Sequence, residues 1–233
     1  MTAKQTFSNS AKAPKNIAPA GIPKDEIIAK IEKHKMPPTF STALSIAVDS
    51  LCFKKGWNAE DYIKHCLTVS DPTNPDLSED EIIVGILHDV VEDTDWELED
   101  LRRVGFSKKI VDAVASVTKK EGEKYFDAVK RASRNPIGRR VKRRDNNHNM
   151  QLTRGPFVAG VKQKYLYHIS WTYLTAVEKG AIPVNTPLWT FLQMKEYKGL
   201  MTAKNYHYIA RETSEPVPQA VLMQFGQPRY RHP

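Results

Sequence analysis

Apolar residues recur every three or four positions along most of this chain, which is the spacing of a helix face. Between residues 107 and 117, for example, Ser107 precedes a stripe made of Ile110, Val111, Val114 and Val117. No segment shows a convincing alternation of apolar and polar residues of the kind that marks a half-buried strand. The pattern therefore predicts an all-α helical bundle.

The expected helices are separated by stretches rich in Pro, Gly, Ser and Asp. They cover residues 23–36, 40–53, 60–70, 78–92, 96–103, 107–117, 123–133, 135–152, 158–180 and 203–212. Ser78 and Glu81 have the spacing of a capping box, and Pro136 suits the first position of a helix. The chain after Pro183 lacks regular periodicity, and the Pro- and Gln-rich tail from Ser214 is expected to be extended.

The organisation that follows is one helical domain with an extension at each end. Residues 1–22 are rich in Ala, Lys, Pro, Ser and Asn and are expected to form a disordered basic tail. Residues 23–182 form the expected domain, and residues 183–233 a partly helical C-terminal extension. The aromatic residues of the extension are expected to pack in a core; covering a site or forming a homo-oligomer surface are the alternatives. They are Trp189, Phe191, Tyr197, Tyr206 and Tyr208.

The composition narrows the class of partner. A formal net charge of +8 favours phosphate-bearing partners such as nucleotides or nucleic acid, although a solvated positive face would give the same charge. No apolar run approaches the roughly 20 residues of a membrane span, and residues 1–23 lack the apolar stretch of a signal peptide. Cys52 and Cys66 lie in apolar contexts and are expected to be reduced and buried, which fits a cytoplasmic protein.

The strongest chemical signal is a group of polar residues at the end of an apolar helix. His88-Asp89 follows the apolar run 82–87, and Glu92-Asp93 lies one turn further on. Residues four apart share a helix face, so His88 is expected beside Glu92, and Asp89 beside Asp93. Burying such groups is costly unless they bind a cation or pair with one. A metal site is therefore expected; a helix that ends in an acidic loop is the alternative.

Two further residues complete a possible ligand set. His65 and Asp145 lie on separate expected helices, so that two imidazoles and two carboxylates are available with His88 and Asp89. Mixed nitrogen and oxygen ligands suit Mn²⁺, Fe²⁺ or Zn²⁺ better than Ca²⁺. Four protein ligands would leave room for water and a phosphate oxygen, and Glu92 and Asp93 could orient that water. Taken singly, His65 could be a structural histidine and Asp145 a partner of its neighbouring arginines.

The basic run before Asp145 adds candidate substrate contacts. Lys142, Asp145 and Asn149 have the spacing of one helix face. We expect the lysine to meet a substrate phosphate and the asparagine a sugar hydroxyl. A solvated cationic helix is the alternative for Lys142 and the expectation for Arg139 and Arg140.

Four motifs taken together resemble a known family. They are Tyr62 to His65 (Tyr-Ile-x-His), Gly85 to Thr94, Val117 to Lys119 and Asp145 to Met150. This combination resembles the HD-type hydrolase domain of RelA/SpoT homologues, over about residues 40 to 180. The segment from Tyr125 to Arg154 is especially similar to the stand-alone small hydrolases of that group.

The resemblance implies a helical HD-domain phosphohydrolase that uses Mn²⁺. In the family the positions of His65, His88, Asp89 and Asp145 bind the metal. Those of Glu92 and Asp93 assist the attack of water, and that of Asn149 contacts the ribose. The family reaction removes pyrophosphate from the 3′ position of the alarmone (p)ppGpp, and some small members act on other nucleotides, including NADPH.

The chain departs from the family at positions that bear on the nucleotide rather than on the metal. The family carries a basic loop, Arg-Lys-Ser-Gly-x-Pro-Tyr, ahead of its first histidine. Here Lys54 and Lys55 are expected to stand in for the basic pair, and Trp57 either to stack on a base or to pack on the bundle. The family's Lys-Leu-Ala-Asp is Lys142-Arg-Arg-Asp145 here. The alternatives are therefore another nucleotide substrate, such as a nucleoside triphosphate, or a basic nucleic-acid-binding protein with an HD fold.

Overall fold

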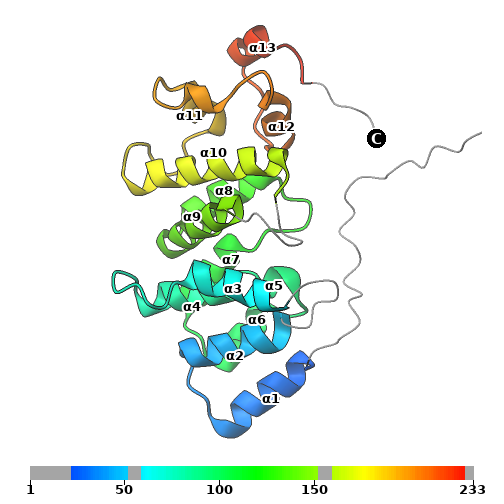
Figure 1. Ribbon diagram of the computed structural model, residues 1–233, viewed down its shortest axis with the longest axis vertical. Helices are drawn as coiled ribbons and strands as arrows, with labels where there is room; N and C mark the ends of the chain where they lie inside the picture. The colour runs from blue at the N-terminus through cyan, green and yellow to red at the C-terminus, as the bar shows by residue number, and fades with distance from the viewer. Residues whose placement is uncertain (1–21, 52–58, 152–158, 229–233) are drawn as a thin grey trace, which may run out of the picture.

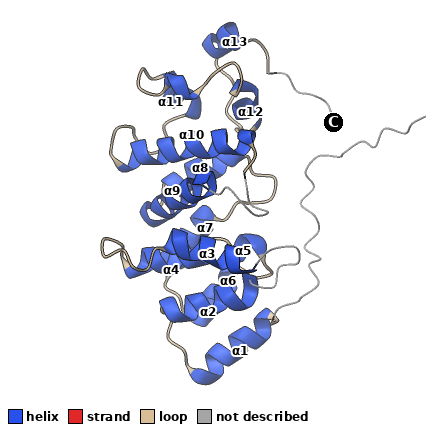
Figure 2. Ribbon diagram, in the orientation of Figure 1, coloured by secondary structure: helices blue, strands red, loops and turns tan. Residues whose placement is uncertain are grey.

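The computed structural model describes residues 22–51, 59–151 and 159–228, and the regular structure in these ranges is helical throughout (Figure 2). In chain order the helices are α1 (Lys24–His34), α2 (Phe40–Leu51), α3 (Ala59–Ser70), α4 (Glu79–Leu87), α5 (Val90–Asp93), α6 (Leu98–Val104), α7 (Lys108–Val117), α8 (Tyr125–Ser133), α9 (Pro136–Gln151), α10 (Val161–Glu178), α11 (Leu188–Gln193), the 3₁₀ turn η1 (Lys198–Leu200), α12 (Tyr206–Arg211) and α13 (Gln219–Phe225). The predicted all-α bundle is confirmed. The expected N-terminal tail up to residue 21 lies outside the described residues.

The molecule is elongated, with α1 at one end of its long axis and α13 at the other (Figure 1). Helices α3, α4 and α9 lie near the middle, and α10 crosses over α9 (Figure 1). None of the described helices is both long enough and apolar enough to cross a membrane.

The helix starts largely follow the local signals in the sequence. The Ser78 hydroxyl accepts the Glu81 amide and the Glu81 carboxylate accepts the Ser78 amide, which is the predicted capping box. The Ser107 hydroxyl likewise accepts from the Ile110 amide, and the predicted apolar stripe of α7 is buried. Local capping chemistry therefore fixes where α4 and α7 begin.

Two expectations about helix extent are wrong. The helix expected over 78–92 is interrupted at His88 and Asp89, which form a turn between α4 and α5. The Gly85 carbonyl, the acceptor that a continuous helix would offer to residue 89, lies 2.8 Å from Nδ1 of His88. In the tail expected to be extended, α13 forms because Val221 is buried against a core made by other helices.

Two apolar clusters stabilise the bundle. The first joins residues of α1 to α7 with Ile137 and Val141 of α9. The second joins α8 to α10, α11, α12 and α13, and it contains Trp189, Phe191 and Tyr206, as predicted for a core. Tyr197 packs against this second cluster, and the ring of Tyr208 lies 5.6 Å from Nζ of Lys162. The domain boundary expected at residue 182 stays a prediction.

Glycines allow two close helix crossings next to the predicted ligands. A Cβ at Gly85 of α4 would lie 2.5 Å from the Ser70 Cα of α3. A Cβ at Gly138 of α9 would lie 1.9 Å from the Ser116 hydroxyl of α7. Because no other residue lets backbones approach so closely, these glycines set the spacing of the helices that carry His65, His88 and Asp145.

Candidate metal centre and its cavity

The structure brings the four predicted ligands together. His65 comes from α3, His88 and Asp89 from the turn after α4, and Asp145 from α9. The His88 Nε2 lies 3.2 Å from the His65 Nε2 and 3.2 Å from the Asp89 Oδ2. The His65 Nε2 lies 3.4 Å from the Asp145 Oδ1 and 3.7 Å from the Asp89 Oδ2. The His88 Nε2 lies 3.8 Å from the Asp145 Oδ1. We refer to these four residues as the metal centre.

These spacings and donor types fit a divalent cation. For metal–ligand bonds of about 2.1 Å, adjacent ligand atoms lie about 3.0 to 3.4 Å apart, from right-angled to tetrahedral geometry. The distances of 3.2, 3.2 and 3.4 Å lie in this range, and those of 3.7 and 3.8 Å correspond to wider angles at the ion. His65, His88 and Asp145 are all buried, and facing nitrogen and oxygen atoms repel unless a positive charge lies among them. Burial lowers the pKa of His88, but Asp89 and Asp145 outweigh it and raise this pKa to about 9. The centre therefore favours positive charge.

The two imidazoles are oriented by contacts at Nδ1, the ring nitrogen that does not face the centre. Nδ1 of His88 is 2.8 Å from the Gly85 carbonyl, so the ring donates there and turns the lone pair of Nε2 toward the centre. Nδ1 of His65 is 2.7 Å from Nδ1 of His148, whose ring stacks on it with centroids 4.9 Å apart. His148 was not predicted as a site residue, although its place three residues after Asp145 was the available signal.

Lys142 and Asn149, predicted to contact substrate, both contact Asp145. The Lys142 ammonium donates to Oδ2 at 2.7 Å and the Asn149 amide donates to Oδ1 at 2.6 Å. Burial would raise the pKa of Asp145, but Lys142 and the two histidines hold it well below its ordinary value. Lys142, Asp145 and Asn149 thus share one face of α9, as expected. Lys142 and Asn149 hold the Asp145 carboxylate in place, and all three residues line the cavity.

The two acids beyond the centre, predicted to handle water, both accept hydrogen bonds from the protein. Oε2 of Glu92 accepts the backbone amide of Lys119 at 2.8 Å, and Asp93 accepts the hydroxyl of Tyr62. Burial raises the pKa of Glu92, against the opposing charge of Lys142. A carboxyl group with a raised pKa is suited to accepting and releasing a proton near neutral pH.

A cavity of about 420 Å³ lies against the centre. The metal centre contributes His65, Asp89 and Asp145 to its wall, and Glu92 and Asp93 lie beside them. Other polar side chains on the wall are Tyr62, Lys119, Tyr125, Lys142, Asn149, Gln163 and Tyr167. Its volume lies in the range of small-molecule sites, roughly 300 to 1,000 Å³. Tyr125 and Tyr167 were not predicted as site residues, because aromatic spacing alone does not separate a cavity wall from a core.

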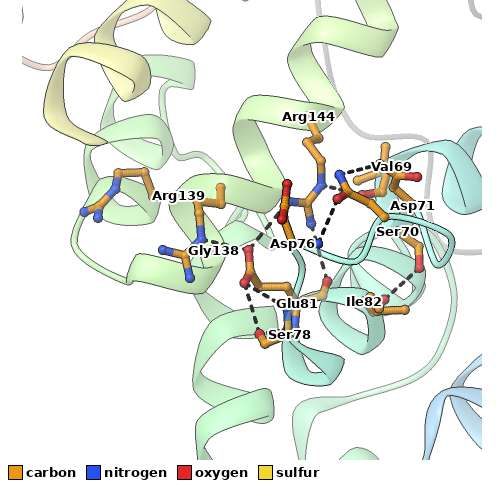
Figure 3. Close-up of polar contacts among 12 residues, drawn as sticks. Val69, Ser70, Asp71, Asp76, Ser78, Glu81, Ile82, Gly138, Arg139 and Arg144 are labelled. Atoms are coloured by element: carbon orange, nitrogen blue, oxygen red, sulfur yellow. Dashed lines mark hydrogen bonds and ion pairs between the residues drawn. The ribbon is translucent and has the colours of Figure 1, made fainter. Parts of the chain in front are cut away.

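Arginines on another face of α9 form a separate set of contacts, which we call the arginine network (Figure 3). Nε of Arg144 donates to the Val69 carbonyl of α3 at 2.7 Å, and Nε of Arg140 donates to Glu81 of α4 at 2.7 Å. Arg139 and Arg140 both pair with Glu178 of α10. The expectation that Arg139 and Arg140 are solvated is wrong: their side chains are 13% and 32% exposed because Glu81 and Glu178 draw them in. This network ties α9 to α3, α4 and α10.

The remaining predicted substrate contacts, Lys54, Lys55 and Trp57, lie outside the described residues. No protein-family model matches the chain, and no curated protein matches it. The similarity of its motifs to RelA/SpoT hydrolases therefore stays a prediction.

Proposed function

We propose that this protein is a divalent-metal-dependent phosphohydrolase acting on a nucleotide, with a (p)ppGpp-type guanosine 3′-pyrophosphate as the first candidate substrate. One observation carries the proposal: His65, the adjacent His88 and Asp89, and Asp145 come from three separate segments and meet beside a cavity. The nitrogen atoms of the two imidazoles lie 3.2 Å apart, and each lies 3.2 to 3.8 Å from an oxygen of both carboxylates. Such convergence is typical of a metal-assisted site rather than of a structural polar cluster.

The metal centre would hold Mn²⁺, with another divalent transition metal as the alternative. When bound, such an ion lowers the pKa of a water molecule and polarises a phosphoryl oxygen. The protein's own groups would prepare this chemistry. Gly85 and His148 orient the two imidazoles, and Lys142 and Asn149 hold Asp145.

Proton transfer is assigned to Glu92. Its carboxylate lies on the cavity wall, its pKa is raised by burial, and the Lys119 amide fixes its position. Asp93, held by Tyr62, stands beside it and would help to orient the water. These roles need a carboxylate that reaches the cavity but is not itself a metal ligand. Glu92 and Asp93 both line the cavity and are not among the four proposed ligands.

The nucleotide class is supported by charge and by the motif resemblance. Lys119 and Lys142 both line the cavity; Lys142 pairs with Asp145, and none of the described acids pairs with the ammonium of Lys119. It is therefore available for a substrate phosphate. A cytoplasmic location is part of the proposal, because Cys66 is a buried free thiol. NADPH and nucleoside triphosphates are the next substrates to test.

The decisive experiment incubates purified protein with Mn²⁺ and ppGpp and separates the nucleotides, with chelator-treated protein in parallel. We expect release of pyrophosphate and GDP only when metal is present. Glu92→Gln should keep its bound metal and lose at least about 100-fold in turnover, whereas the exposed Glu121→Gln should match the wild type. Full turnover by Glu92→Gln would remove its assigned role. A wild-type protein that binds Mn²⁺ yet cleaves none of these nucleotides would overturn the proposal. Salt-sensitive binding to RNA or DNA would then favour the nucleic-acid alternative.

A further inference from the structure

The cavity wall opposite the predicted acids includes Tyr167 of α10, which no sequence motif singled out. Its position is fixed by packing and hydrogen bonds to α9. The ring of Tyr125 meets the ring of Tyr167 edge-on, with centroids 6.0 Å apart. Asn146, next to Asp145, accepts the Tyr125 hydroxyl at 3.0 Å and donates to the Ser170 hydroxyl of α10 at 2.6 Å. Tyr167 is thereby held beside the metal centre.

Most polar groups on the wall are already committed to protein partners. The hydroxyl of Tyr62 donates to Asp93, and that of Tyr125 donates to Asn146. Lys142 and Asn149 both donate to Asp145. Within the described residues, by contrast, the Tyr167 hydroxyl has no hydrogen-bond partner, although the side chain is only half-exposed and lines the cavity. The hydroxyl is therefore available to a ligand that enters the cavity.

The uncommitted groups share one chemical character. Burial, reinforced by Asp145, raises the pKa of Tyr167, so its hydroxyl stays protonated and can donate. The other uncommitted group with a fixed charge is the Lys119 ammonium, which can only donate. A ligand that satisfies both groups while it reaches the metal centre must be rich in acceptor oxygens and negatively charged. Phosphate and pyrophosphate groups have this character.

We propose that Tyr167 is a substrate-contacting residue that donates its hydroxyl to an oxygen of a phosphate or pyrophosphate group bound between the metal centre and Lys119. This inference rests on the proposed function and names the part of the ligand that the α10 wall recognises. Tyr125 supports the contact by packing against the Tyr167 ring, and its own hydroxyl is occupied by Asn146.

The test compares Tyr167→Phe with Tyr165→Phe, a control two residues earlier on the same helix, where the tyrosine is 36% exposed and absent from the cavity wall. Inorganic pyrophosphate is titrated calorimetrically into each Mn²⁺-loaded protein. A hydrogen bond to a charged oxygen contributes about 1.5 to 3 kcal/mol, so Tyr167→Phe should bind about 10- to 100-fold more weakly. Tyr165→Phe should bind as the wild type does. Both variants should keep the wild-type metal content and unfolding temperature.

Binding by Tyr167→Phe within twofold of the wild type overturns the inference, as does a Mn²⁺-loaded wild type that binds no pyrophosphate. If wild type binds pyrophosphate and Tyr167→Phe does not, while neither cleaves any nucleotide, then the proposed hydrolysis fails and the Tyr167 contact stands. Where turnover is measurable, the lost contact should raise KM or lower kcat without changing metal affinity. That pattern separates a substrate contact from a structural role.

Discussion

Helix α9 carries two polar clusters on different faces, one part-buried and one buried, and they are built on opposite principles. In the arginine network each cation meets an anion or a carbonyl: Arg140 meets Glu81, Arg139 meets Glu178, and Arg144 meets the Val69 carbonyl. In the metal centre, two carboxylates and two imidazoles direct their free atoms at one another. The first cluster is satisfied by the protein alone, whereas the second is the one that we propose a cation completes.

This difference separates a structural cluster from a functional one on physical grounds. Buried charges are tolerated when they are paired and hydrogen-bonded, and breaking such a pair costs stability. In the metal centre, Lys142 pairs with Asp145, and the two carboxylates raise the pKa of His88 to about 9. The cluster therefore attracts positive charge, and we propose that a metal ion supplies it. The comparison can be tested in two ways. One removes a single charge from each cluster, and the other forces α3 away from α4 and the turn that follows it, since these segments contribute residues to both clusters.

The largest effect is expected from Asp89→Asn, which removes a ligand charge and keeps the side-chain shape. Metal affinity should fall at least about 100-fold and turnover at least about 1,000-fold, since the water and the phosphate lose their cation. Elemental analysis after dialysis and a turnover assay measure both. Asp112→Asn, at an exposed ion pair with Lys108, is the matched control and should change neither. Retained metal in Asp89→Asn would mean that Asp89 is not a ligand.

Gly85→Ala should act on both clusters, because its Cβ would lie 2.5 Å from the Ser70 Cα and force α3 away from α4. Overpacking of this kind costs about 1 to 3 kcal/mol, and the backbone contact here places the loss near the upper limit. Moving Gly85 also shifts the carbonyl that orients His88. Denaturant unfolding and Mn²⁺ titration should show loss of stability together with loss of metal affinity.

The control for this substitution is Gly199→Ala, where an added Cβ meets nothing within 4 Å. It should leave stability and metal affinity unchanged. If Gly85→Ala were as stable as the wild type, the close crossing of α3 and α4 would not be what sets the separation of His65 and His88.

The fold and the meeting of the four candidate ligands were predictable because their signals are local or additive. Helix α7 follows from one apolar stripe and one capping serine. The four candidate ligands come from motifs on three segments, namely α3, the turn after α4 and α9, and the packing of these segments brings them together. These signals do not depend on which helices pack against each other.

The features that the sequence did not predict depend on tertiary packing. Spacing alone did not reveal the turn at His88, because the contact from its ring to the Gly85 carbonyl depends on packing at the centre. Glu178, the partner of Arg139, is 39 residues away. The role of Tyr167 depends on Tyr125 of another helix. Such pairings are set by tertiary packing, which neither helical periodicity nor local motif spacing contains.

A smaller effect, confined to stability, is expected from Glu81→Gln in the arginine network. It removes the carboxylate that Arg140 contacts at 2.7 Å and leaves Arg140 with Glu178 alone. Breaking a buried pair costs about 3 to 5 kcal/mol, and we expect about 2 kcal/mol here because the Arg140 side chain is 32% exposed. Metal affinity should stay within about threefold of the wild type. A large loss of metal affinity would show that the two clusters are not independent.

Glu123→Gln is the matched comparison for that substitution, because Glu123 pairs with Arg131 and the arginine also donates to two backbone carbonyls. It should destabilise the protein to a similar extent by denaturant unfolding. A stability loss at Glu123 without any at Glu81 would remove the structural role assigned to the arginine network.

The smallest expected effect is the change with pH of the stability that Glu81 contributes through the arginine network. Burial raises the pKa of Glu81, but hydrogen bonds from Arg140 and Ser78 outweigh burial and hold this pKa below its ordinary value of 4.5. A carboxylate with a lowered folded-state pKa contributes stability that is fully present above its unfolded pKa and is lost as pH falls through the folded value. The stability difference between wild type and Glu81→Gln should therefore be constant from pH 7 to about pH 5 and shrink as the pH falls further. Paired denaturant titrations at pH 7 and at about pH 3.5 measure it. A difference that grew on acidification would mean that Glu81 is protonated more readily in the folded state, against the contacts with Arg140 and Ser78.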